Sequence, residues 1–166
     1  MDILLEVVTA FALLLQAFED PFLFIALISL CALVLGIFNR NYAVSFFVTI
    51  GLTFGVTHSI KSLFKIARPE DALVVANGYR FPSMHAALGA ALLTSCAWYL
   101  CTRIPSLSVR ISIILITAIS IICIGWTRIF LGVHETIDVV TGIILGTSIS
   151  LLLHGGMHLF HLDTDR

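Results

Sequence analysis

Long apolar runs separated by short polar connections make up most of this chain. An apolar run of about 18 residues or more is typical of a transmembrane helix. The first run is the weakest, because at ~1.5 Å per residue it extends only about 24 Å, less than a ~30 Å hydrocarbon core, and it contains Glu6. We still expect every run to form a helix, since the polar loops described below must reach the same side. The six runs are Ile3–Phe18, Phe22–Phe38, Tyr42–Phe64, Met84–Cys101, Val109–Leu131 and His134–Phe160.

The composition supports a membrane protein with a single domain. Of 166 residues, 59% are hydrophobic and 11% are charged, and the mean hydropathy is +1.07, well above the usual soluble range. We therefore predict an all-α fold, a six-helix transmembrane bundle forming one integral-membrane domain over residues 1–166. The bilayer is the expected partner. A net charge of −1 gives no ground for a nucleic-acid partner, and the pattern leaves the oligomeric state open.

Cysteine spacing argues against a disulfide framework or a zinc site. All four cysteines lie within apolar runs, and none forms a C-x-x-C pair. We interpret them as small buried hydrophobic residues. His154, His158 and His161 share a helical spacing near the C-terminus, and we interpret them as an interfacial polar face rather than as a metal site. We expect no metal and no cofactor.

The distribution of basic residues predicts the orientation. Six helices place both termini on one side, together with Arg40, Arg103, Arg110 and Arg166. The other side has Lys65 and Arg80 once the candidate site residues are set aside. The positive-inside rule then assigns the termini to the cytoplasm. The protein is expected in the cytoplasmic membrane, if it is bacterial, with the polar loops at the outer membrane–water boundary of helices three to six.

Small residues indicate which helices pack closely. Helix three contains Gly51-x-x-x-Gly55 and helix six contains Gly142-x-x-x-Gly146, while helix four begins with several alanines. Small residues at this spacing let helix backbones approach closely in lipid. Helices three, four and six are therefore predicted to form the packed centre.

Between the last two apolar runs lies a stretch rich in ionisable groups, Thr127–Asp138. Charged groups there are costly to bury in a membrane and so indicate function. His134 and Asp138 are four residues apart, which places them on one face if His134 opens a helix. The carboxylate would hold the imidazole in one tautomer and leave its other nitrogen free to attack. Arg128 offers a planar fork suited to a phosphate.

Two further polar segments flank helix four. Lys61 and Arg68 are seven residues apart, two turns along one helix face, and Pro69 disfavours helix at Arg68, so that its guanidinium is expected to turn into the bundle. Ser83 is a natural N-cap whose helix offers free N–H groups to a phosphate. His85, in the first turn, is placed to donate a proton to a leaving oxygen.

Together these segments resemble the three-part signature of the type-2 phosphatidic acid phosphatase family, which includes the vanadium haloperoxidases. The family pattern K-x6-R-P, P-S-x-H and S-R-x5-H-x3-D reads here as Lys61…Arg68-Pro69, Pro82-Ser83-x-His85 and Thr127-Arg128-x5-His134-x3-Asp138. Thr127 replaces the usual serine but keeps a hydroxyl. Met84 stands where many members have glycine, which preserves the backbone N–H but brings a side chain that would crowd the pocket. The resemblance covers essentially the whole chain.

The resemblance implies a role for each matched residue. His134 would attack phosphorus and form a phosphohistidine, Asp138 would orient it, and His85 would protonate the leaving group. The phosphoryl oxygens would be held by a further set of residues. This set comprises Lys61, Arg68, Ser83, the Met84 amide and Arg128. Phosphoryl transfer needs mainly positioning and charge neutralisation, which three cations can supply without a metal.

The sequence leaves the substrate and the reaction partly open. A membrane setting favours a phosphorylated lipid, and candidates are undecaprenyl pyrophosphate, phosphatidylglycerophosphate, phosphatidic acid and lipid A phosphate. Glu70, Asp71, Asn77 and Arg80 lie in the loop above the site and are either selectors among these lipids or solvated loop residues. Two alternatives to a lipid phosphatase remain: a lipid phosphotransferase with the same nucleophile, and an anion or proton transporter using the same ionisable groups.

Overall fold

The computed structural model describes residues 39–69, 72–74 and 76–159, with a few isolated positions before residue 39, and side chains up to residue 157. The first two predicted helices fall outside these ranges, so the count of six helices stays a prediction. Glu70 and Asp71 also lie outside the described residues. Within them the regular structure is entirely helical, and four helices are long and apolar enough to cross a membrane. The predicted all-α transmembrane architecture is therefore confirmed at this coarser level.

The four helices coincide with the last four apolar runs to within a few residues. They are α3 (Arg40–Phe64), α4 (Met84–Arg103), α5 (Leu107–Phe130) and α6 (Thr136–Leu159). Side chains cap two of them: Asn39 accepts a hydrogen bond from Tyr42 N at 2.8 Å, and Ser83 accepts one from Ala86 N at 3.5 Å. Each cap satisfies an N–H group that the first helical turn leaves without a partner.

Helix α3 ends earlier than the spacing of Lys61 and Arg68 suggested. Its last residue is Phe64, and Lys65 follows in the left-handed conformation (φ 49°), donating its N–H to Lys61 O. The prediction that Lys61 and Arg68 share one helix face is therefore wrong. A left-handed residue redirects the chain at once, and Arg68 belongs to the extended loop that follows.

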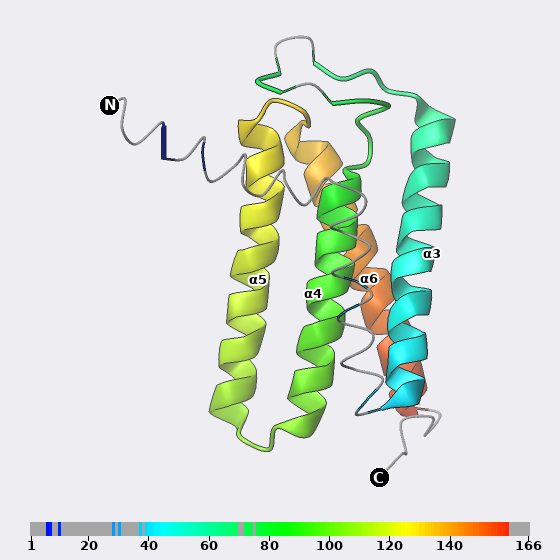
Figure 1. Ribbon diagram of the computed structural model, residues 1–166, viewed down its shortest axis with the longest axis vertical. Helices are drawn as coiled ribbons and strands as arrows, with labels where there is room; N and C mark the ends of the chain where they lie inside the picture. The colour runs from blue at the N-terminus through cyan, green and yellow to red at the C-terminus, as the bar shows by residue number, and fades with distance from the viewer. Residues whose placement is uncertain are drawn as a thin grey trace.

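The helices run side by side with α4 and α6 in contact, and the loop between α3 and α4 lies over one end of the bundle (Figure 1). The α4–α6 approach is very close: a Cβ added at Gly142 would lie 2.6 Å from Ser83 O, and one at Gly146 would lie 2.0 Å from Ala87 O. These distances leave no space for a side chain. The predicted role of small residues is thus confirmed for α6.

The corresponding glycine pair of α3 behaves differently. Gly51 and Gly55 are exposed, and an added Cβ would meet no atom within 4 Å at either position. The prediction that this G-x-x-x-G segment packs against a helix does not hold among the described residues. Helix α3 instead contacts α4 through larger side chains, including Tyr42 and Phe46, which are buried with Leu88.

Polar side chains inside the bundle contact one another toward the end opposite the α3–α4 loop. His154 is 1% exposed, its Nδ1 lies 3.2 Å from Ser45 Oγ, and its ring stacks on Tyr42 with 4.7 Å between centroids. The Tyr42 hydroxyl donates to Ser95 O at 2.7 Å. The interpretation of His154 as interfacial is therefore wrong, because the residue lies in the interior. His158 and His161 have no described side chain.

Candidate active site

Ends of all four helices meet beneath the α3–α4 loop. The C-terminal ends of α3 and α5 and the N-terminal ends of α4 and α6 lie at the same end of the bundle (Figure 1). Each predicted site residue lies on one of these ends or on the adjoining loops. Two backbone contacts tie the segments together: Ser83 N donates to Asp138 O at 2.9 Å, and Leu73 N donates to Leu131 O at 3.0 Å.

His134 and Asp138 form the centre of this region. His134 lies in the turn before α6 rather than on the helix, yet its Nδ1 is 3.5 Å from Asp138 Oδ2. Both residues are buried, at 4% and 0% exposure. The distance is longer than an ordinary hydrogen bond. The carboxylate faces one ring nitrogen and leaves the other directed elsewhere.

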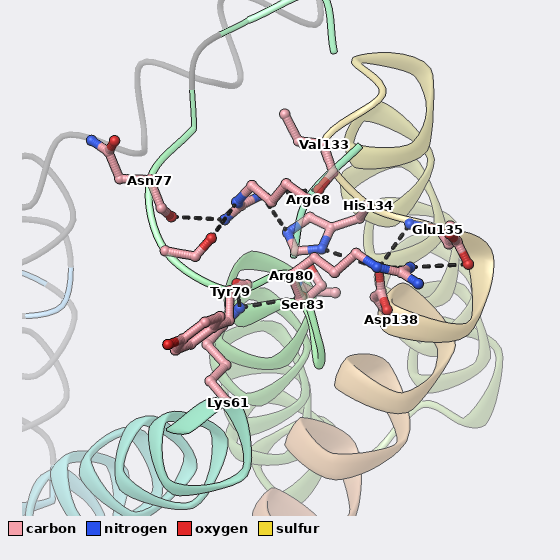
Figure 2. A network of polar contacts seen from close by, with 12 residues as sticks. Lys61, Arg68, Asn77, Tyr79, Arg80, Ser83, Val133, His134, Glu135 and Asp138 are labelled. Atoms are coloured by element: carbon pink, nitrogen blue, oxygen red, sulfur yellow. Dashed lines mark hydrogen bonds and ion pairs between the residues drawn. The ribbon is translucent and has the colours of Figure 1, made fainter. Parts of the chain in front are cut away.

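Arg68 occupies the opposite side of the imidazole. Its Nη1 lies 3.4 Å from His134 Nε2 and donates to Val133 O at 2.9 Å. Its other nitrogens donate to Gly78 O and Asn77 O, both at 3.2 Å. Figure 2 shows the guanidinium between the loop carbonyls and the ring. A group bound to Nε2 would therefore lie next to a fixed positive charge.

Lys61 reaches the same loop from the last turn of α3. Its Nζ donates to Tyr79 O at 2.6 Å and to Arg80 O at 3.2 Å (Figure 2). Carbonyl oxygens of loop residues 77–80 thus accept hydrogen bonds from both Lys61 and Arg68. These contacts hold the two cations in place beneath the loop.

The electrostatic environment keeps the His134 ring uncharged. Burial, and then the positive charges of Arg68 and Lys61 with smaller effects of His85 and Arg128, lower the pKa of His134 to about 2. The physical cause is that an imidazolium is poorly solvated there and lies among other cations. At neutral pH the ring is therefore neutral, with one nitrogen lone pair available.

The start of α4 supplies a second set of groups. Ser83 is fully buried at the N-cap, and His85 lies in the first turn, partly buried. The Met84 side chain packs against the apolar cluster that contains Tyr42 and Leu88. The Met84 N–H lies in the first turn of α4, and whether its side chain also crowds the pocket stays a prediction.

Arg128 lies at the end of α5 and is only 2% exposed. Its Nε donates to the hydroxyl of Thr127 at 3.4 Å. Thr127 is buried as well, and it donates to Ile124 O at 2.8 Å. The hydroxyl that replaces the family's serine is thus in contact with the neighbouring arginine.

The sequence did not predict the most direct contact to Asp138. Arg80 Nη1 donates to Asp138 Oδ2 at 3.0 Å and lies 3.0 Å from Glu135 Oε2 (Figure 2). The sequence left Arg80 as either a selector among lipids or a solvated loop residue, and it gave no role to Glu135. The only feature of the sequence that pointed to Arg80 was its position, two residues before the P-S-x-H segment. Asn77 is exposed, and it contributes its backbone carbonyl, which accepts a hydrogen bond from Arg68.

Among the described residues, no group of three or more His, Cys, Asp or Glu side chains is arranged to hold a metal ion. The absence of a cofactor stays a prediction.

The fold and the site together define a class of protein. It is a helical membrane protein with histidines and cations gathered at one end of its bundle. The chain belongs to the PAP2 superfamily, whose model matches residues 42–160. The predicted family is thereby confirmed, and the matched range contains all three signature segments.

One curated sequence and one crystal structure, both from Bacillus subtilis, resemble the chain. Phosphatidylglycerophosphatase B of strain 168 is 32% identical over 98 residues, covering 58% of this chain and 48% of the relative, so the chain spans about half of that protein's length in the match. The crystal structure of a transmembrane PAP2-type phosphatidylglycerolphosphate phosphatase has a TM-score of 0.80, at 24% identity over 100% of this chain and 81% of that one. The second likeness supports the fold.

Proposed function

We propose that this protein is a membrane phosphatase that hydrolyses a lipid phosphomonoester or a polyprenyl pyrophosphate through a phosphohistidine, without a metal. The observation that carries the proposal is the position of His134, with Nδ1 facing Asp138 and Nε2 facing Arg68. One nitrogen is thereby supported by a carboxylate, while the other points at a cation that can bind phosphate. Membership in the PAP2 superfamily agrees with this chemistry.

In the first step, Nε2 of neutral His134 attacks phosphorus and forms an N–P bond. The bond from phosphorus to the leaving oxygen breaks, and protonated His85 gives its proton to that oxygen. Asp138 stabilises the positive charge that develops on the ring. Lys61, Arg68, Arg128, Ser83 and the Met84 N–H hold the phosphoryl oxygens and offset their charge.

In the second step, water attacks the phosphohistidine. His85, now neutral, removes a proton from the water as its oxygen bonds to phosphorus. The N–P bond breaks, which releases inorganic phosphate and returns His134 to its neutral form. His85 ends the cycle protonated, so that the residue acts first as an acid and then as a base.

The substrate class follows from the membrane setting. Four apolar helices surround the site's end of the bundle, so a lipid can present its phosphate while its chains remain in the bilayer. Phosphatidylglycerophosphate is the first candidate to test, because the similar Bacillus subtilis protein is a phosphatidylglycerophosphatase. Phosphatidic acid, undecaprenyl pyrophosphate and lipid A phosphate complete the panel.

We also propose that the site faces outward in a cytoplasmic membrane. Arg40 begins α3, Arg103 ends α4 and Arg110 lies in the first turn of α5, all at the end opposite the site (Figure 1). The positive-inside rule places that end in the cytoplasm. To test this, a single cysteine is placed at position 79 or at position 106 in a chain whose own cysteines are replaced. In intact cells, a membrane-impermeant maleimide should label the cysteine at position 79 and not the one at position 106.

The decisive experiment traps the intermediate. Purified protein in detergent is mixed with ³²P-labelled lipid phosphate and quenched in base, because phosphohistidine is stable there and labile in acid. Parent protein should carry an alkali-stable label, and His134→Ala should carry none and release no phosphate. His58→Ala is the matched control, since His58 lies on an exposed part of α3 outside the proposed site. Turnover by His134→Ala at the parental rate would exclude the nucleophile.

Product analysis in the same assay separates the alternatives. A hydrolase transfers the label to inorganic phosphate, whereas a phosphotransferase would move it to an added lipid acceptor. Protein that forms no phosphoenzyme, yet moves an anion or protons across vesicle membranes, would support the transporter alternative.

A further inference from the structure

The Asp138 carboxylate makes contacts that the proposed mechanism does not use. Its Oδ2 accepts hydrogen bonds from Arg80 Nη1 at 3.0 Å and from Glu135 N at 2.8 Å, and the same oxygen is the one 3.5 Å from His134 Nδ1. Its Oδ1 is buried and has no hydrogen-bond partner among the described residues. Arg80, Glu135 N and His134 therefore all contact the same oxygen of the side chain.

The contact from Glu135 N has a structural purpose. Glu135 is the residue before α6, and Asp138 is the third residue of the helix, so its side chain returns to the first free N–H as in a capping box. This contact fixes the position of Asp138 along the helix. It leaves open what orients the carboxylate toward the imidazole.

Arg80 is the side chain that contacts the Asp138 carboxylate and can orient it toward the imidazole. Its side chain is 14% exposed, Asp138 is fully buried, and the charge-assisted contact between them is direct. The second carboxylate on the same Nη1, that of Glu135, is 58% exposed, and an exposed ion pair contributes little. The ion pair of Arg80 with buried Asp138 is therefore expected to be stronger than its ion pair with exposed Glu135.

Resting on the proposed function, we propose that Arg80 is a positioning residue, which holds the Asp138 carboxylate in place for His134 and offsets part of its negative charge. This second effect matters because an unscreened carboxylate would favour the protonated imidazolium, which cannot attack phosphorus. Other charged or titratable groups also face His134 or Asp138, from every element around them. They are Lys61 and Arg68 from α3 and its loop, His85 from α4, Arg128 from α5, and Glu135 at the start of α6.

Three variants of the full-length protein test the proposal. Arg80→Gln removes the charge and should lower kcat/KM on the order of tenfold at pH 7.5, the lower end of what orienting groups contribute around metal-bound histidines. The deficit should grow between pH 7.5 and pH 5, because His134 protonates at a higher pH once Asp138 is unscreened. Arg80→Lys keeps the charge and should restore the parental pH dependence. Glu135→Gln, which removes the equally short exposed contact, should stay within about threefold of parent.

The outcomes separate this proposal from the proposed function. If His134→Ala is inactive while Arg80→Gln has parental kcat/KM from pH 5 to 7.5, only the role of Arg80 is excluded. A constant deficit at all pH values, not relieved by Arg80→Lys, would show loss of structure rather than of charge and would also overturn it. Arg80→Met gives a second uncharged variant, and aggregation of both would assign Arg80 to folding instead.

Discussion

Nδ1 of His134 lies 3.5 Å from Oδ2 of Asp138, although His134 is outside the helix that carries Asp138. The turn at Gly132, which has a positive φ of 71°, brings the imidazole back over the first turn of α6. Glycine adopts this backbone conformation without the steric cost that other residues meet. The contact between the proposed nucleophile and the carboxylate therefore depends on a backbone feature of the preceding turn.

Asp138→Asn should separate catalysis from folding. An asparagine oxygen can still accept the Glu135 N–H that begins α6, but a neutral amide cannot stabilise a phosphorylated imidazolium. We expect kcat to fall about 10²- to 10⁴-fold with unfolding in detergent unchanged. Asp138→Ala loses both functions and should also destabilise the protein by ~1 kcal/mol. Parental turnover by Asp138→Asn would remove the carboxylate from the mechanism.

Arg128→Lys should impair turnover despite keeping the charge. Arg128 is 2% exposed, and a lysine ammonium cannot reproduce its planar set of donors. We expect kcat/KM for a lipid phosphate to fall about 10²-fold. Arg103→Lys, at the opposite end of the bundle where Arg103 lies 5.1 Å over the Tyr99 ring, should behave as parent. If both variants are equally active, Arg128 does not contact the phosphoryl group as a fork.

The extent of the four helices and the grouping of the candidate site residues were predictable, because both leave local patterns in the sequence. Apolar runs defined α3 to α6 to within a few residues, and fixed spacings marked His134, Asp138 and Arg128. Charged residues in such runs are rare enough to stand out. The structure gathers these residues at one end of the bundle, as the grouping predicted.

The contacts that were missed depend on loop conformation. Lys65 ends α3 through a left-handed backbone, which no periodic pattern indicates, and this moves Arg68 off the helix. Arg80 lies 58 residues from Asp138 in sequence, so only the path of the loop reveals their contact. The two glycine pairs were indistinguishable in sequence, because whether a helix faces a neighbour is decided by tertiary packing.

The buried His134 should make stability depend on pH. Its pKa is about 6.5 in the unfolded chain and about 2 when folded, lowered first by burial and then by Arg68. Between these values the unfolded chain binds more protons, so stability is complete above pH 6.5 and is lost as the pH falls below it. From pH 7.5 to 5.5 this residue should lower the free energy of unfolding by about 1.4 kcal/mol.

Unfolding of the parent and of His134→Asn in mixed micelles at the two pH values measures this contribution. Asparagine does not titrate, so the variant should lose about 1.4 kcal/mol less than the parent between pH 7.5 and 5.5. Equal losses would mean that His134 is accessible to protons in the folded protein. The same data would then contradict the neutral nucleophile at low pH.

Gly146→Ala should disrupt the site from a distance. A Cβ at this position would lie 2.0 Å from Ala87 O, so α6 must move away from α4. The same helix pair holds Ser83 N on Asp138 O at 2.9 Å, and this contact should lengthen as the helices separate. We expect a loss of about 1–3 kcal/mol of stability, as in other overpacked interiors, together with reduced kcat.

Gly51→Ala is the matched control, because the same substitution on α3 meets no atom within 4 Å. Alanine is favoured over glycine within a helix by about 1 kcal/mol, so this variant should be at least as stable as parent and equally active. Thermal unfolding in detergent and phosphate release from a lipid phosphate measure both effects. If Gly146→Ala retained parental stability and activity, α4 and α6 would not need their close approach, and the Ser83–Asp138 contact would not be set by helix packing.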